Sequence, residues 1–132
     1  MFLLSGLFAV NLDITNVNLS GVTLEVNMSN DESVGGFQFS LPGVTILGAS
    51  GGSAASNGFT VSASSETVLG FSFTGGTIPI GNETLVEVSF SDFSGEICLA
   101  GQVISNPIGG SIASTVGDCF TLTEGCTDAS AC

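Results

Sequence analysis

The stretch Val22-Thr-Leu-Glu-Val-Asn-Met-Ser29 decides the fold, because apolar and polar side chains alternate along it without a break. Successive side chains of a β-strand point to opposite faces, so this period of two predicts a strand with one buried and one solvated face. The predicted buried face holds Val22, Leu24, Val26 and Met28. A helix does not produce this pattern, since apolar residues on one helix face recur every three or four positions.

Similar alternation continues on both sides of this stretch. It is clearest in residues 8–15 and 84–90, and shorter apolar runs occur at 37–41, 44–47, 59–61, 68–73, 97–104 and 119–122. The segment 48–58, rich in Gly, Ala, Ser and Asn, predicts a loop, and no stretch of eleven residues has helical spacing. Nine or ten short strands joined by glycine-rich turns indicate an all-β protein, an antiparallel β-sandwich of the jelly-roll type.

The composition excludes several classes of function. The 132 residues include 12 acidic side chains and no Lys, Arg or His, which gives a formal net charge of −12. Without a basic side chain no phosphate can be neutralised, so nucleic acids and anionic membranes are excluded as partners. P-loop and triad chemistry fail for the same lack of a lysine or a base. Glu25 and Glu87 could be neighbours on outward strand faces, but solvated carboxylates are commoner there, and we predict no enzyme.

The negative charge makes divalent cations the first partner to consider. Calcium prefers carboxylate and carbonyl oxygens that are clustered in a loop. Asp31 and Glu32 directly follow the decisive strand, and Asp92 and Glu96 flank a glycine turn, so these four are the candidate calcium ligands. None of them matches an EF-hand loop, and solvated turn residues would give the same pattern. Both interpretations stay open.

Four cysteines indicate disulfides and an oxidising compartment, since the chain has neither Cys-x-x-Cys nor the histidine that zinc sites commonly use. Three pairings are possible. The most economical joins Cys98 to Cys119 and Cys126 to Cys132, and free buried thiols are the alternative.

Three N-x-Ser/Thr sequons would be glycosylation acceptors in a source that glycosylates its proteins. They begin at Asn18, Asn27 and Asn82. Each alone is a weak signal, because an Asn-rich sequence produces sequons by chance. Together with the cysteines they favour a secreted or cell-surface protein.

A pattern of Gly-Phe-x-[Phe/Val]-[Ser/Thr] occurs at 36–40, 58–62 and 70–74. Its intervals differ, so it is not a solenoid repeat. The pattern predicts that each Phe fills the core while the adjacent Gly bends or bulges the strand. Phe2 and Phe93 are the candidates for an exposed ring, and since Trp and Tyr are absent, polysaccharide binding is only an alternative.

From Val10 to about Ser105 the order of these features resembles the cohesin-like β-sandwich, a fold shared with several carbohydrate-binding modules. The segments that carry the resemblance are Val22-Thr-Leu-Glu-Val-Asn-Met-Ser-Asn30, Val34-Gly-Gly-Phe-Gln-Phe-Ser-Leu41, Val44-Thr-Ile-Leu-Gly48, Val68-Leu-Gly-Phe-Ser-Phe73 and Gly81-Asn-Glu-Thr-Leu-Val-Glu-Val-Ser-Phe90. The resemblance implies a module that binds a dockerin-like protein, or a carbohydrate-binding module. The tail Gly125-Cys-Thr-Asp-Ala-Ser-Ala-Cys132 is similar to a cysteine motif of very large secreted surface proteins, so we expect one module of a longer protein.

The apolar N-terminus suggests a different role. It lacks the positive start and clean cleavage site of a signal peptide, which predicts an ordered strand. Such a strand either completes its own sheet or adds to the edge of a neighbour's sheet, and repeated addition builds filaments. The candidate assembly residues are Phe2, Leu3, Leu4, Leu7, Phe8 and Val10.

We therefore expect three segments: an exchangeable strand at 1–9, a cohesin-like sandwich at 10–123 and a cysteine-bounded tail at 124–132. The favoured function is an extracellular structural or adhesive module, a fibre subunit or surface-protein repeat that binds copies of itself or neighbouring modules. A cohesin-type module for a dockerin-like partner is the alternative.

Overall fold

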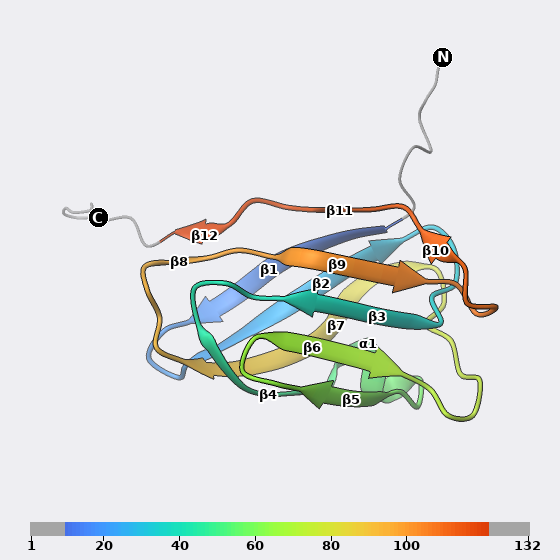
Figure 1. Cartoon of the computed structure of the whole chain (residues 1–132), viewed down its shortest axis with the longest axis horizontal. Helices are drawn as coiled ribbons and strands as arrows, with labels where there is room; N and C mark the ends of the chain where they lie inside the picture. Colours follow the sequence, from blue (N-terminus) through green and yellow to red (C-terminus); the bar gives the residue numbers. More distant parts are fainter. Residues whose placement is uncertain (1–9, 122–132) are drawn as a thin grey trace, which may run out of the picture.

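Two five-stranded β-sheets packed face to face make up most of the computed structural model, which describes residues 10–121 (Figure 1). Within the described residues the first sheet has the order β11-β1-β2-β7-β4, the second has the order β10-β9-β3-β6-β5, and β8 and β12 form a separate ribbon. Every pair of neighbours is antiparallel except β1 and β11, which are parallel. The predicted all-β sandwich is confirmed.

The strands number twelve in residues 10–121, slightly more than the nine or ten predicted. Four of them are only two or three residues long, too short to show alternation in the sequence. The bounds are β1 (Val10–Asn18), β2 (Thr23–Asn30), β3 (Gly36–Ser40), β4 (Thr45–Ser50), α1 (Gly52–Ser56), β5 (Thr60–Ala63), β6 (Thr67–Phe71), β7 (Gly81–Ser91), β8 (Glu96–Ile97), β9 (Ala100–Ser105), β10 (Ser111–Ile112), β11 (Ser114–Val116) and β12 (Phe120–Thr121).

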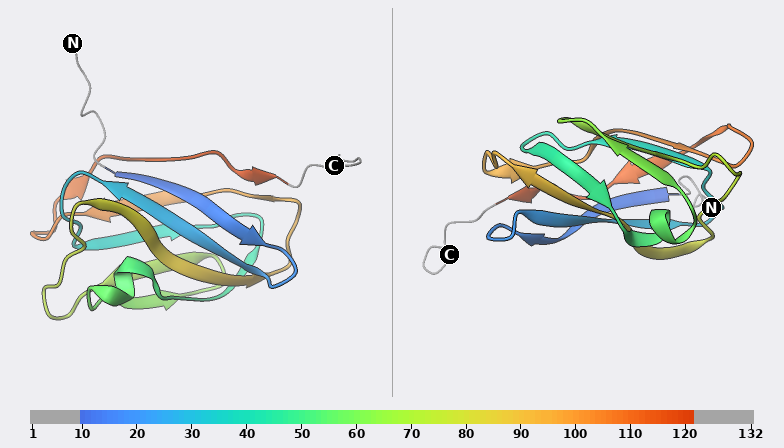
Figure 2. Two further views of the ribbon diagram at one scale, coloured as in Figure 1. Left: turned by 180° about the vertical axis from the view of Figure 1, so that it is seen from behind. Right: turned by 90° about the horizontal axis from the view of Figure 1, so that it is seen from below.

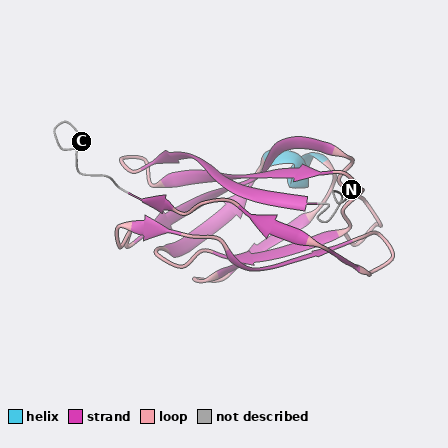
Figure 3. Cartoon of the chain, turned by 90° about the horizontal axis from the view of Figure 1, so that it is seen from above, coloured by secondary structure: helices cyan, strands magenta, loops and turns pink. Residues whose placement is uncertain are grey.

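The core lies between the two layers, which Figures 2 and 3 show from further directions. Leu24, Val26 and Met28 of the decisive stretch are buried as predicted, with at most 1% of each residue exposed. Val22 is a correction: it precedes β2 in the turn from β1, with φ +53° and 41% of its surface exposed. The hairpin needs a left-handed residue there, and turn geometry overrides the apolar pattern.

The segment predicted as a loop at 48–58 contains the end of β4 and the five-residue helix α1, which packs against β7 and β5. One turn of helix is too short to produce helical periodicity, so the sequence gives no sign of it. The short apolar run at 44–47 predicts a fully buried segment, but Leu47 is 64% exposed. Its chain neighbour Ile46 is buried and pairs with Phe90, so the alternation of the strand places Leu47 on the outer face.

The glycine–phenylalanine pattern is confirmed as core in its first two copies. The ring of Phe37 stacks on the rings of Phe39 and Phe59, with ring centroids 6.1 Å apart in both pairs. Gly70 on the neighbouring strand β6 allows this arrangement, because a Cβ atom there would overlap the Phe37 ring. The glycine therefore makes room for an aromatic ring on the next strand.

Gly70→Ala is expected to lower the free energy of unfolding by about 1–3 kcal/mol, because the added methyl group overpacks the core at Phe37. The matched control is Gly48→Ala, since a Cβ there would meet the Ser89 Oγ at an ordinary 3.6 Å. Urea unfolding of both variants measures the difference. Equal loss of stability in the two would contradict this account of Gly70.

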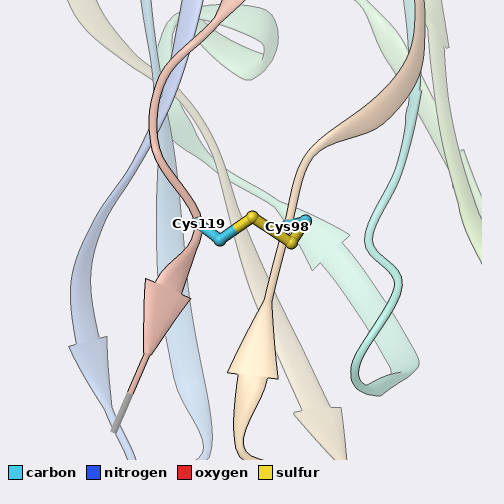
Figure 4. The surroundings of a disulfide bond; sticks show 2 residues. All are labelled: Cys98 and Cys119. Carbon is cyan, nitrogen blue, oxygen red and sulfur yellow. A yellow bond between two sulfur atoms is a disulfide. The ribbon is translucent and has the colours of Figure 1, made fainter. Parts of the chain in front are cut away.

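A disulfide joins Cys98, next to β8, to Cys119, next to β12 (Figure 4). This is the pairing that the sequence favoured. Phe120, the residue after Cys119, packs its ring against that of Phe93, with centroids 6.0 Å apart. Cys126 and Cys132, together with the predicted tail segment, lie outside the described residues.

Because Cys98 and Cys119 are 21 residues apart, removing their cross-link frees a loop in the unfolded chain. We expect the double variant Cys98→Ala and Cys119→Ala to lose about 3 kcal/mol of stability, most of it through unfolded-state entropy. Chemical unfolding in urea gives the value. A reducing agent should lower the wild-type stability and leave that of the double variant nearly unchanged; a large effect on the variant would show that another disulfide dominates.

Candidate protein-binding face

The outer face of the second sheet carries a row of exposed side chains that crosses four strands. Val103 of β9, Gln38 of β3, Leu69 of β6 and Ser62 of β5 are directly paired in register. Val103 is 53% exposed and Leu69 40% exposed. Their chain neighbours Val68 and Ile104 are buried, so the alternation of each strand presents this row to solvent.

Charge divides the two sheets. Asp13, Glu25, Glu83 and Glu87 lie on β1, β2 and β7, so we call the first sheet the carboxylate sheet. No strand of the second sheet, within residues 10–121, contains a charged residue, and we call it the uncharged sheet. In a chain whose charges all have one sign, this is the broad sheet surface that a partner can cover without burying a strand carboxylate.

The carboxylate sheet satisfies its charges with neutral donors. Glu25 and Glu87 are paired in register, as neighbours on β2 and β7. The Oε1 atom of Glu25 accepts hydrogen bonds from Asn16 Nδ2 at 2.8 Å and from Thr84 Oγ1 at 3.1 Å. These contacts hold one carboxylate of the pair.

One end of the uncharged sheet carries an aromatic pair that sequence reasoning missed. Phe71, at the end of β6, is half-buried, and Phe73 beyond it is 80% exposed. Their rings meet edge to face, with centroids 4.8 Å apart. The core interpretation of the pattern is therefore wrong for its third copy. The Thr-Gly-Gly sequence directly after Phe73 is a turn signal that could have indicated this.

Of the two residues expected to expose a ring, Phe2 lies outside the described residues, and Phe93 is half-buried against Phe120. Polysaccharide binding stays a prediction, because neither of these two residues presents an exposed ring within residues 10–121.

At its other end the uncharged sheet borders an open pocket of about 360 Å³. The pocket is lined by residues of the β3–β4 connection, with Ser40, Ala100 and Glu66 at its margins. The Oγ of Ser40 and the Oγ1 of Thr67 share a hydrogen bond of 3.1 Å beside it. Along the uncharged sheet the exposed row therefore lies between the aromatic pair at one end and this pocket at the other.

The four candidate calcium ligands do not come together. Asp31 and Glu32 follow β2 at one end of the sandwich, whereas Asp92 and Glu96 follow β7 at the opposite end. Among residues 10–121, the one cluster of three acidic or cysteine side chains joins Glu96 to Cys98 and Cys119. Since both sulfur atoms are in the disulfide, this cluster offers a metal a single carboxylate.

The three sequons all lie on the carboxylate sheet or its turns. Asn27 is on β2, Asn82 is on β7, and Asn18 ends β1, where its Oδ1 accepts a hydrogen bond from the backbone N–H of Gly21 at 2.9 Å. Whether they carry glycans stays a prediction. Their placement leaves the uncharged sheet free of glycan acceptors within residues 10–121.

Of the candidate assembly residues, Phe2, Leu3, Leu4, Leu7 and Phe8 lie outside the described residues. Val10 is a correction, because it begins β1 and is fully buried in the core of its own chain. It is therefore not available to a neighbouring molecule.

Comparison with solved structures identifies the fold. A non-cellulosomal cohesin from the archaeon Archaeoglobus fulgidus matches with a TM-score of 0.61 and 18% identity over 87% of this chain and 91% of that one. A chain of a type I cohesin–dockerin complex from Clostridium thermocellum matches with a TM-score of 0.59 and 13% identity, covering 83% and 90%. A type II cohesin domain from the cellulosome of Acetivibrio cellulolyticus matches at 0.52 and 12%, covering 84% and 93%.

The chain therefore has the cohesin β-sandwich fold, as the sequence resemblance implied. No protein-family model matches the sequence. No curated protein matches it either. In residues 10–121 the structure has no helix long and apolar enough to cross a membrane.

Proposed function

We propose that the chain is an extracellular cohesin-type module that binds a dockerin-like protein on the outer face of the uncharged sheet. The observation that carries the proposal is the exposed row across Val103, Gln38 and Leu69, on a sheet without carboxylates. The fold supports it, since one of the similar structures is a cohesin–dockerin complex. The role proposed is binding, not catalysis.

Physical chemistry favours this face over the other. The buried centre of a protein interface is apolar and depleted in charge, because each unpaired charge costs several kcal/mol to desolvate. A partner on the carboxylate sheet would have to pair Asp13, Glu25 and Glu87 with cations of its own. A partner on the uncharged sheet covers Leu69 and Val103 while the surrounding negative field attracts a basic molecule to it.

Leu69→Asp is expected to weaken partner binding by at least about tenfold, because it replaces an exposed apolar side chain of the row with a carboxylate. Leu47→Asp is the matched control, since Leu47 is also an exposed leucine on a strand but belongs to the carboxylate sheet. Calorimetric titration against a panel of dockerin modules in calcium buffer gives the affinities. Equal loss in both variants, or capture of no dockerin by the wild-type chain, contradicts the proposal.

A fibre subunit is the second candidate, favoured by one observation. Strand β5 is an edge of the uncharged sheet, pairs with β6 alone in the described residues, and has no charged residue to discourage strand addition. The occupant in this hypothesis is the apolar segment 1–9 of a neighbouring copy.

Deleting residues 1–8 separates the two hypotheses. Strand addition predicts that the truncated chain stays monomeric while the full chain forms filaments visible by electron microscopy. Filaments that persist unchanged after the deletion would exclude segment 1–9 as the donor strand. Binding of a dockerin module should not change with the deletion, because the exposed row of the uncharged sheet lies within β3, β5, β6 and β9.

A further inference from the structure

A small pocket lies at the end of the sandwich where β2 finishes, between α1 and the residues that lead into β7. Its volume is about 20 Å³, which is room for a single water-sized occupant. Asn30, Ser53, Pro79 and Glu83 are among the residues that line it. The pocket is separate from the exposed row of the uncharged sheet.

Two buried polar side chains meet at this pocket. Asn30 is 5% exposed and Ser53 is 6% exposed, and within residues 10–121 they are the two residues whose polar side chains are buried. Buried polar groups are nearly always satisfied by hydrogen bonds, and those that are not call for an unseen water or ion. Two such residues beside one cavity indicate that the cavity has an occupant.

The hydrogen bonds of Asn30 leave its oxygen free. Its Nδ2 donates to the carbonyl oxygen of Glu32 at 2.9 Å and to that of Pro79 at 3.0 Å. Carbonyl oxygens only accept, so the nitrogen must face them and the amide orientation is settled. No donor among the described residues bonds the remaining Oδ1. The Oγ of Ser53 likewise makes no hydrogen bond within residues 10–121, although its backbone carbonyl accepts from Asn57.

Glu83 adds a carboxylate at the same place. It is paired in register with Met28, which is buried in the core. Directly opposed residues of an antiparallel pair point to the same side of the sheet, so Glu83 lies on the core side, at the exposed end of the strand. The other three carboxylates of this sheet alternate with buried residues and lie on the outer side. The chain has no Lys, Arg or His that could balance Glu83.

We propose that this pocket binds one calcium ion, with the Oδ1 of Asn30, the Oγ of Ser53 and the carboxylate of Glu83 as ligands. Calcium accepts a mixture of carboxylate, amide and carbonyl oxygens in flexible geometry, whereas magnesium demands a near-ideal octahedron and keeps its waters. A single carboxylate gives a weak site, in the 10⁻⁴–10⁻³ M range of extracellular calcium modules. The ion would fasten the end of β2 to α1 and to the start of β7.

The site differs from the calcium ligands that the sequence suggested. Asp31 and Glu32 are neighbours of Asn30 in the chain, but neither lines the pocket, whereas Glu83, which is exposed as they are, does. An Asn at the end of a strand is an ordinary turn residue and strand carboxylates normally face solvent, so the sequence alone gives no reason to single out Asn30 or Glu83. Only the register of β2 on β7 brings Glu83 to the core side.

Calcium titration at constant ionic strength tests the proposal, because the chain's charge of −12 also attracts calcium nonspecifically. Glu83→Gln should weaken the single site on the order of tenfold or more by removing its charged ligand. Ser53→Ala should weaken it less. The matched control is Glu87→Gln, which removes the same charge from the outer side of the same strand and should leave the site intact. Isothermal calorimetry gives the stoichiometry and affinity for each variant.

Identical calcium binding by the wild-type chain and Glu83→Gln would overturn the proposal and leave the pocket with water alone. Circular dichroism confirms that each variant is folded before the comparison. A crystal soaked in terbium supplies an independent readout, since an anomalous peak between Asn30, Ser53 and Glu83 supports the site. Density for water there, with the ion bound elsewhere or nowhere, would equally sink the idea.

Discussion

Apolar burial between two sheets is the interaction on which everything else in this molecule depends. With no Lys, Arg or His, the chain cannot form a salt bridge between side chains, so its stability comes from the core, the strand ladders and the disulfide. The fully buried rings of Phe39 and Phe90 and the aliphatic side chains around them supply that core. The same lack of cations means that every carboxylate must be placed where water, an amide or a hydroxyl can solvate it.

This requirement explains why the two sheets differ. Carboxylates on β1 and β2 are held by neutral donors: Asp13 accepts from Asn11 Nδ2 at 2.7 Å, and Glu25 from Asn16 and Thr84. A sheet face that is rich in amides and hydroxyls tolerates such groups, and a face that has to meet another protein does not. Of the two five-stranded sheets only one carries strand carboxylates, which leaves the other with an uncharged surface that exposes Leu69 and Val103. The division of charge is thus what makes a protein-binding role physically reasonable.

The sequence was sufficient for the fold class and for most of the core, because strict alternation, as at Leu24, Val26 and Met28, follows directly from strand geometry. It failed where the chain leaves the regular ladder and where an apolar run hides the alternation. Val22 sits in a left-handed turn, Phe73 lies beyond the end of β6, and Leu47 lies on the outer face of β4 beside the buried Ile46. Pairing between strands decides which residues of an apolar run face the core, and a single sequence does not reveal that pairing. The exposed row was missed for the same reason, since Val103, Gln38 and Leu69 become neighbours only in register.

The register shift between β2 and β7 has the most chemical consequence of these breaks. It falls at Val26 and Asn27, and beyond it Met28 pairs with Glu83, so a carboxylate joins the core side of the carboxylate sheet. If only water solvated the Glu83 carboxylate, its place on the core side would add nothing to the stability of the fold. Beside a buried amide oxygen and a buried hydroxyl it completes a set of hard oxygen ligands, and the pocket between them has room for one ion. A chain that carries no cation of its own can then use a bound one to hold the end of β2 against α1 and β7, where a basic side chain would serve in an ordinary domain.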